Sequence, residues 1–437
     1  MKWYSSNETK KWAEINDFLN NSDTAATEVK ITGESQTFDG FGTCFNELGE
    51  IALRNLSDGD RKNVLDLMFD PNADGLRLDV GRMPIGASDY AAKWYSHNEV
   101  EGDYEMKNFT IERDHKYLLP YIKDALARNP ELYFCASPWS PPTWMKFPQA
   151  HNFGTMVWTE ENLKAYALYF VKFIEAYKAL GIDISQIHVQ NEPHSSQKFP
   201  SCVWTGEEMT EFIGKYLGPA LEKAGMSNEI WFGTINGPEV DGRWSITRFN
   251  QYANLALHDP DAAKYIKGVS YQWAGKYAIA STKQSFPDMR LMQSENECGD
   301  GQNTWVYAKY VDELFHHYLY NGANYYVYWN AVLAPNGPST WGWTQNSMIT
   351  VDGEKAVFNH EYYVMKHYSR FVQKGAKVLK TEGRSATNTT AFKNPDGTIV
   401  AVVTNPFSRE MDININLGDE KEINAKLPKD SLNTFVV

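Results

Sequence analysis

The chain has 437 residues, a formal net charge of -13 and a sequence pI near 5.3. Because nucleic acids and anionic membrane surfaces attract clustered Lys and Arg, this acidic balance makes both of them poor partners. Hydrophobic residues make up 42% of the chain and aromatic residues 14%, enough for a large buried core. The length predicts one large domain and a smaller one.

The N-terminal stretch, residues 1–17, lacks the apolar segment and cleavage site of a secretory leader. No uninterrupted run of about 18 apolar residues occurs, so we expect no membrane insertion. If residue 1 is the natural start we expect a cytoplasmic protein, and a secreted one if a leader has been removed. The four cysteines form no C-x-x-C pair, which argues against a zinc site and favours free thiols in a reducing compartment. They are Cys44, Cys135, Cys202 and Cys298.

Short β-branched or aromatic runs, each followed by a helical pattern, recur along the first 330 residues. The eight candidate strands span residues 38–45, 75–82, 132–139, 186–192, 230–237, 268–273, 289–295 and 325–330. Eight strands alternating with helices favour a (β/α)8 TIM barrel over residues 36–370. The alternative is a doubly wound open sheet, which usually carries a Gly-rich phosphate-binding turn after its first strand. The first run, "FDGFGTCF", does not have that spacing.

Two of the intervening helices have clear ends. Residues 161–181 carry apolar residues at helical spacing and stop at Gly181. The next helix begins with a capping box, Thr205-x-x-Glu208, and ends at Gly225. Within it, Gly218-Pro219 predicts a kink, because proline cannot supply a helical N–H.

The sequence changes character after about residue 370. Residues 371–437 contain runs that alternate with period two, separated by turn residues such as Asn394–Gly397. These runs predict an antiparallel β-sandwich. The N-terminal segment, residues 1–35, includes the similarly alternating "TEVKITGES", and we expect it to add a strand to the same domain.

Catalytic side chains of such barrels lie at the C-terminal ends of strands, which selects a few of the 55 acidic residues. Glu192 ends the fourth predicted strand and Glu295 the seventh, while Asp79 lies inside the second and Asp89 follows it. Two facing carboxyls, one neutral and one ionised, are the requirement for glycoside hydrolysis. A solvated or salt-bridged group is the commoner explanation for any single Glu at a strand end.

Several motifs in order along residues 36–370 strengthen the catalytic interpretation. They are "FDGFG", "RMPIGASDY", "CASPWSPPTWMK", "QNEP", "SEN" and "YWN". In these motifs the chain resembles glycoside hydrolase family 30, the retaining β-glycosidases related to glucosylceramidase. The resemblance implies the same barrel with a β-rich side domain, no cofactor and no metal.

The resemblance also implies roles for individual residues. Glu192 matches the general acid/base and Asn191 the partner of the substrate 2-hydroxyl. Glu295 matches the nucleophile, with Glu297 as its rival because residues two apart share a face of a strand. Arg82 resembles the arginine that contacts the nucleophile, where its charge would favour the ionised carboxylate.

Other matches concern the sugar subsite. Asp89 resembles the residue that binds outer hydroxyls of the sugar, and Trp139 and Trp329 resemble the wall and the floor of the subsite. Trp341 and Trp343 could line a leaving-group subsite or simply pack in a loop, and packing is the expected role of Trp144.

One departure from the family concerns the substrate. The mammalian lipid-cleaving members carry histidine and tyrosine where this chain has Gln272 and Ala274, so we place Gln272 among the substrate-binding residues. The change argues against glucosylceramide. We expect a soluble β-linked oligosaccharide, with β-1,6-linked glucan or galactan fragments as candidates by analogy.

The expected reaction is a double displacement in which Glu295 attacks and Glu192 protonates the leaving oxygen. We expect a raised pKa for Glu192, a lowered pKa for Glu295 and a pH optimum on the acid side of neutral. Three alternatives stay open: a glucosylceramidase, a metal-dependent hydrolase and a non-catalytic sugar-binding barrel. The metal alternative lacks support, because the ten histidines contain no H-x-H or H-x-x-x-H pair.

Overall fold

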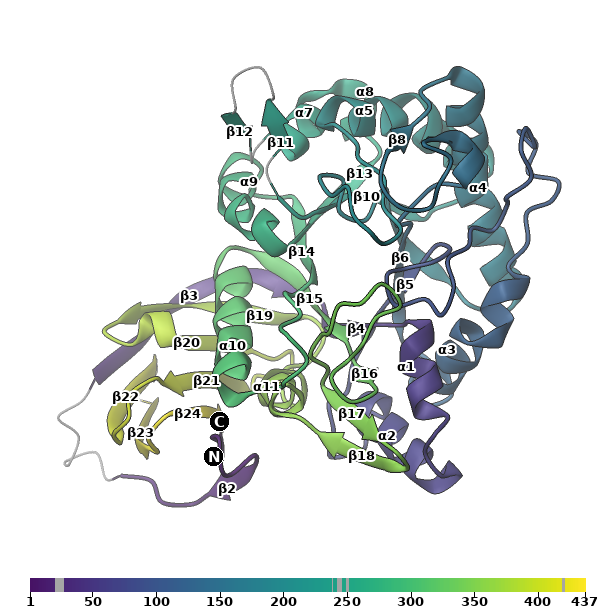
Figure 1. Ribbon diagram of the computed structural model, residues 1–437. Coiled ribbons are helices and arrows are strands. Elements are labelled where there is room, and N and C mark those ends of the chain that lie inside the picture. The colour runs from purple at the N-terminus through teal and green to yellow at the C-terminus, as the bar shows by residue number, and fades with distance from the viewer. Residues whose placement is uncertain (20–26, 238, 242–245, 249–250, 419–420) are drawn as a thin grey trace.

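The computed structural model describes residues 1–19, 27–237, 239–241, 246–248, 251–418 and 421–437. Eight parallel strands close into a barrel, and a nine-stranded sheet lies beside it (Figure 1). The predicted (β/α)8 barrel with a β-sandwich at its side is confirmed.

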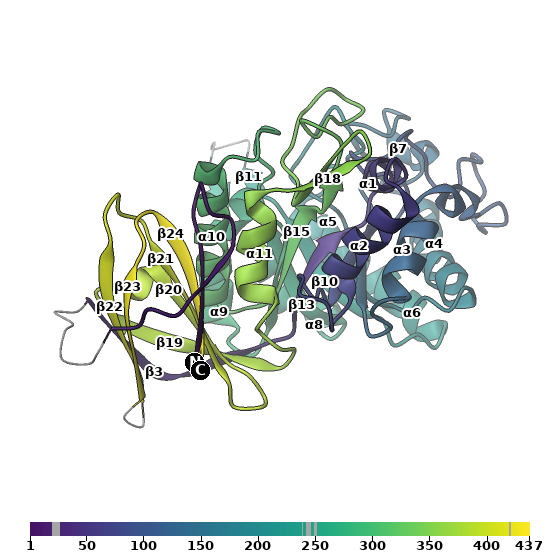
Figure 2. The same ribbon diagram turned by 90° about the horizontal axis from the view of Figure 1, so that it is seen from below.

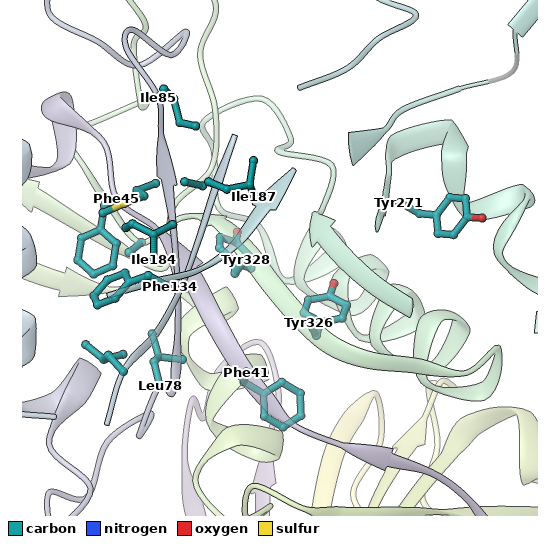
Figure 3. Packing of buried hydrophobic residues seen from close by; sticks show 14 of the residues in the cluster. Phe41, Phe45, Leu78, Ile85, Phe134, Ile184, Ile187, Tyr271, Tyr326 and Tyr328 are labelled. Atoms are coloured by element: carbon teal, nitrogen blue, oxygen red, sulfur yellow. The ribbon is translucent and has the colours of Figure 1, made fainter. Parts of the chain in front are cut away.

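The barrel strands follow the predicted runs in order. They are β4 (Gly40–Cys44), β5 (Val80–Pro84), β6 (Tyr133–Ser137), β9 (Ile184–His188), β10 (Glu229–Ile235), β13 (Ile266–Gln272), β14 (Arg290–Glu295) and β15 (Ala323–Asn330). Closure occurs between β15 and β4, which pair in parallel. Side chains alternate between two environments, as a strand requires. Cys44 and Cys135 belong to the cluster that also contains Trp139 and Trp329. Phe45 and Phe134 belong to the larger cluster shared with the helices, and Figure 3 shows both.

Helices and short hairpins connect these strands. The helices are α1 (Glu47–Leu53), α2 (Asp58–Phe69), α3 (Leu118–Leu126), α4 (Glu160–Ala179), α5 (Gly206–Glu211), α6 (Gly218–Lys223), α7 (Gln251–His258), α8 (Pro260–Ala263), α9 (Ile279–Ser285), α10 (Trp305–Tyr320) and α11 (His360–Ser369). Single turns of 3-10 helix are η1 (Glu112–Lys116), η2 (Thr143–Met145), η4 (Trp273–Tyr277) and η5 (Ala386–Asn388). Two short strand pairs are β7 (Lys146–Phe147) with β8 (Thr155–Met156) and β11 (Glu239–Asp241) with β12 (Ile246–Arg248). A three-stranded sheet contains β16 (Val332–Leu333), β17 (Ile349–Asp352) and β18 (Lys355–Phe358).

Two strands begin or end four or more residues from their predicted positions. β5 starts at Val80 because Arg77 adopts a left-handed φ of 54° that interrupts the extended run before it. Asp79 therefore precedes β5 at the base of the barrel, not inside a strand. β9 ends at His188, so Glu192 lies four residues beyond the strand and not at its last position.

The helix with the predicted capping box is irregular next to Gly218-Pro219, where the sequence predicts a kink. Thr205 and Glu208 form the box, which confirms the predicted start. Between α5 and α6 the chain forms a π-helical turn, η3 (Phe212–Leu217). Pro219 at the start of α6 lacks the N–H that a regular α-helix would use there, which accounts for the wider turn just before it.

The nine-stranded sheet combines both ends of the chain. Its order is β2 (Ala13–Ile15), β1 (Lys2–Ser6), β24 (Ser431–Val436), β21 (Ile399–Asn405), β20 (Thr389–Lys393), β19 (Ala376–Gly383), β3 (Thr27–Phe38), β22 (Met411–Gly418) and β23 (Lys421–Leu427). β1 pairs with β24, and β3 runs between β19 and β22. The N-terminal strand addition is thus confirmed. Figure 2 shows α10 and α11 between this sheet and the barrel.

Candidate active site

A pocket of about 260 Å³ opens at the C-terminal ends of the barrel strands. Its lining residues are Asp89, Trp139, Asn191, Glu192, Ser195, Gln197, Phe199, Asn236, Trp273, Ala274, Glu295, Trp343 and Gln345. Both predicted catalytic glutamates therefore share one cavity, at the end of the barrel where such sites occur.

Glu295 is the last residue of β14, and both of its carboxylate oxygens accept hydrogen bonds. Oε2 accepts from Nη1 of Arg82 at 2.7 Å, in an ion pair whose side chains are 1% and 7% exposed. Oε1 accepts from the indole Nε1 of Trp273 at 3.1 Å. The carboxylate is therefore held on one side by a cation and on the other by a neutral donor.

Glu192 is held by its backbone as well as its side chain. Its φ is +48°, a left-handed conformation that is costly for a residue with a Cβ. The backbone N–H of Glu192 donates to the carbonyl of Thr234 at 3.2 Å, and the Nε2 amide of Gln272 donates to its Oε1 at 3.2 Å. Proline at 193 follows directly, which restricts how the chain leaves this position.

Arg82, from β5, connects the two glutamate segments. Its Nη1 binds Glu295, while its Nη2 donates to Oδ1 of Asn191 at 2.5 Å and to the hydroxyl of Ser137 at 3.0 Å. Oδ1 of Asn191 also accepts from Thr234 and Gln272. With its oxygen engaged three times, Asn191 presents its NH2 group as the donor for a ligand.

The two carboxyls have different electrostatic surroundings. Burial and the nearby charge of Glu295 raise the pKa of Glu192 to about 7. Burial also raises the pKa of Glu295, which corrects our expectation of a lowered value: Arg82 and Trp273 offset only part of the cost of burying the charge. Since only Glu295 has an ion-pair partner, the proton that the pair holds near neutral pH belongs on Glu192.

Residues expected at the sugar subsite divide into two layers. Asp89 and Trp139 line the pocket, and one carboxylate oxygen of Asp89 is buried without a hydrogen-bond partner. Trp329 lies behind them, stacked on Trp139 with ring centroids 5.5 Å apart. The guanidinium carbon of Arg82 lies 4.8 Å from the centroid of Trp139 and 5.7 Å from that of Trp329. The aromatic pair thus covers the buried cation.

Gln272 lies beneath the pocket surface and is fully buried. Its amide nitrogen contacts Glu192 and Asn191, and its Oε1 accepts from the hydroxyl of Ser294 at 3.0 Å. These contacts connect β13 and β14 with the segment after β9. A contact between Gln272 and the substrate stays a prediction. The structure shows Gln272 in contact with Glu192, the predicted acid.

The remaining tryptophans fall into different places. Trp144 is 8% exposed and its indole donates to the carbonyl of Asn98 at 3.0 Å, in agreement with a packing role. Trp343 lines the pocket, and Trp341 packs behind it against Phe199 with ring centroids 5.0 Å apart.

Glu297, the rival of Glu295, points away from the pocket. β14 ends at Glu295, so the two-residue alternation of a strand does not extend to Glu297. Its Oε1 pairs with Lys276 and accepts from the hydroxyl of Tyr310 at 3.0 Å. The geometry therefore favours Glu295 as the carboxylate facing Glu192.

Sequence reasoning missed six of the pocket residues, and two of these, Trp273 and Gln345, contact residues that it had predicted. Trp273 follows Gln272, which was predicted to bind substrate, yet nothing in the sequence indicates that the Trp273 indole faces Glu295. Gln345 lies in a loop after β15, where its Oε1 accepts from Trp329 at 3.0 Å and from Asn330 at 2.7 Å. Its NH2 group can therefore serve a ligand. Gln345 lies in a loop without a periodic pattern, and Trp273 begins the turn η4 although the sequence predicted it as the last residue of the strand 268–273.

In the part of the chain that the structure describes, no three His, Cys, Asp or Glu side chains gather as metal ligands would. Nor does any described helix combine the length and apolarity needed to cross a bilayer. All four cysteines are buried free thiols.

Comparison with known proteins agrees with this geometry. The family model for the glycosyl hydrolase family 30 TIM-barrel domain matches residues 38–372, and the model for the family 30 beta sandwich domain matches residues 375–435. Putative glucosylceramidase 1 of Caenorhabditis elegans is 30% identical over 405 residues, which cover 85% of this chain and 74% of that protein. Lysosomal acid glucosylceramidase of Mus musculus is 27% identical over 433 residues, or 92% of this chain and 81% of that one.

A solved structure of an endo-beta1,6-glucanase superposes with a TM-score of 0.88 at 25% identity, covering 100% of this chain and 98% of the other. The barrel model alone spans more than half of the chain. The chain therefore belongs to glycoside hydrolase family 30 and is a glycoside hydrolase.

Proposed function

We propose that this enzyme hydrolyses β-linked gluco-oligosaccharides, with β-1,6 linkages preferred, by a retaining double displacement. The observation that carries the proposal is the shared pocket of Glu192 and Glu295, in which only Glu295 pairs with a cation. Glu295 then attacks the anomeric carbon while Glu192 gives its proton to the leaving oxygen. In the second step Glu192 takes a proton from water, which releases the sugar.

Substrate binding follows from the groups that remain free in the pocket. The NH2 groups of Asn191 and Gln345 and the unpartnered oxygen of Asp89 suit sugar hydroxyls, and the face of Trp139 suits the apolar face of a pyranose. The lining also contains three polar side chains that can contribute hydrogen bonds to a second sugar. They are Ser195, Gln197 and Asn236.

The proposed preference for β-1,6 linkages rests on similarity to a solved structure and on these polar residues. The structural neighbour at TM-score 0.88 is an endo-beta1,6-glucanase. A ceramide leaving group would have little use for three hydrogen-bonding side chains. The second candidate, cleavage of glucosylceramide, is favoured by the names of the nematode and mouse relatives.

A product screen tests the proposal. The purified protein is incubated with short β-1,6- and β-1,3-linked glucans, with aryl β-glucoside, β-galactoside, β-xyloside and β-fucoside, and with glucosylceramide in detergent. We expect cleavage of the β-1,6 substrates, and proton NMR of the first product should show the β-anomer. Release of the α-anomer would refute double displacement, and cleavage of glucosylceramide alone would favour the second candidate.

A further inference from the structure

Trp273 makes a contact with the proposed nucleophile that neither composition nor motif indicates. Its indole Nε1–H donates to Oε1 of Glu295 at 3.1 Å, while Oε2 is held by Arg82 at 2.7 Å. The pocket lining includes Trp273 and Glu295 but not Arg82, which lies deeper. Of the two donors to Glu295, Trp273 is therefore the one nearer to a bound substrate, and it binds Oε1.

The backbone of Trp273 is unusual for such a large side chain. Its φ is +47°, a left-handed conformation that a residue with a Cβ adopts only where the surroundings impose it. Here the turn η4 is fixed against β10. A Cβ on Gly275 would lie 2.0 Å from the carbonyl oxygen of Ile235, so the turn packs directly on that strand.

The same turn is also tied to the segment that carries Glu295. Lys276 forms an ion pair with Glu297, two residues after Glu295, and the ring of His317 contacts the carbonyl of Lys276 at 2.9 Å. One contact of η4 with Glu297 and one with α10 therefore hold the turn, and with it the indole, in place beside the carboxylate.

We propose that Trp273 is a positioning residue that orients the Glu295 carboxylate for attack and stabilises its ionised form. The proposal rests on the proposed function, in which Glu295 is the nucleophile. As the new bond forms between the anomeric carbon and a Glu295 oxygen, the bond to the leaving oxygen breaks and that oxygen takes the Glu192 proton. The indole can only donate, so it favours the carboxylate over the carboxylic acid.

A pair of matched substitutions separates this role from pocket packing. Trp273→Phe keeps an aromatic ring and removes the N–H, and Trp343→Phe makes the same change in the neighbouring pocket ring, whose centroid lies 5.8 Å away. For Trp273→Phe we expect the acid limb of kcat/KM to move up by about one pH unit, equivalent to a tenfold smaller ionised fraction on that limb. For Trp343→Phe we expect a higher KM and an unmoved acid limb.

A titration without turnover distinguishes failure of this inference from failure of the proposed function. The pKa of Glu295 is followed by carbon-13 NMR of labelled Glu carboxyls in Glu192→Gln, with and without Trp273→Phe; loss of one signal in Glu295→Gln assigns it. A higher pKa in the Trp273→Phe protein supports the inference even if the screen finds no β-glycosidase activity. An unchanged pKa and acid limb would overturn it and leave Trp273 as a wall of the pocket.

Discussion

The two glutamates differ by one neighbour, and that difference assigns their roles. Arg82 pairs with Glu295, whereas Glu192 receives hydrogen bonds only from neutral groups, the amide of Gln272 and the hydroxyl of Ser195. Burial alone would keep both carboxyls protonated to higher pH. The guanidinium makes Glu295 the easier one to ionise, and its charge then makes Glu192 the harder one.

Azide rescue tests these roles separately. With an activated aryl β-glycoside, Glu295→Ala plus azide should yield the α-glycosyl azide, because azide then enters from the side vacated by the nucleophile. Glu192→Ala plus azide should yield the β-glycosyl azide, because azide attacks the glycosyl-enzyme from the opposite side. NMR of the products decides, and exchanged anomers would reverse the assignment.

The pH profile follows from the same pair. Glu192 must be protonated to act as the acid, so kcat/KM should fall as pH rises through about 7, the pKa to which burial and Glu295 raise it. It should also fall at low pH as Glu295 loses its charge. Glu192→Gln, assayed with an activated leaving group, should lack the alkaline limb.

Asp89 offers a competing origin for that limb. Its pKa is also raised well above the ordinary value, by burial and by the charges of Glu295 and Glu192. Survival of the alkaline limb in Glu192→Gln would therefore assign the limb to Asp89 and contradict the proposed acid.

At the scale of elements, the loops after the strands hold the site together. The turn η4 after β13 contacts the end of β14 through the Trp273–Glu295 hydrogen bond and the residue after next through the Lys276–Glu297 ion pair. The Lys276 and Glu297 side chains are 14% and 13% exposed, so their charges are largely removed from water. Removing one partner leaves the other as an uncompensated charge.

Glu297→Gln should therefore lower the stability of the fold and affect the catalytic rate only slightly. We expect a melting temperature lower by a few degrees, corresponding to about 2 kcal/mol, and only a several-fold loss of kcat/KM. Glu295→Gln is the matched variant: it should lose activity on every substrate. Calorimetry and initial rates measure the two effects. A complete loss of activity in folded Glu297→Gln would restore it as the candidate nucleophile.

For the whole molecule, α11 lies between the barrel and the β-sheet and carries a buried acid (Figure 2). Oε1 of Glu361 accepts from Asn346 at 2.7 Å, and its other oxygen is buried without a partner. Burial raises its pKa from 4.5 to about 8. Between these values the folded protein keeps a proton that the unfolded chain has lost, so this group lowers the free energy of unfolding as pH rises.

Glu361→Gln removes this titration and should flatten the dependence of stability on pH. Between pH 5 and 8 its free energy of unfolding should fall less than that of the parent, by up to about 4 kcal/mol at 1.36 kcal/mol per pKa unit. Denaturant titrations at several pH values measure the difference. Exposed Glu354→Gln serves as the control, and parallel curves for Glu361→Gln and the parent would contradict the prediction.

Much of the fold was predictable because it depends on repeated patterns. Eight apolar runs separated by helices predicted the barrel, and period-two alternation predicted the β-domain, including the strand from residues 27–38. The errors occurred where one backbone angle overrides a pattern, as Arg77 does before β5. The pKa of Glu295 was predicted with the wrong sign because the sequence does not reveal how deeply a charge is buried.

The sequence by itself determined which residue types could perform the chemistry, since motifs such as "QNEP" and "SEN" place Glu192 and Glu295 after predicted strands. Only the tertiary structure decided which of their neighbours face them. Trp273 begins the turn η4, and Gln345 and Glu297 lie on loops; in all three places side-chain direction depends on packing between segments distant in the chain. Local sequence periodicity carries no information about such contacts, because they form only when the barrel closes.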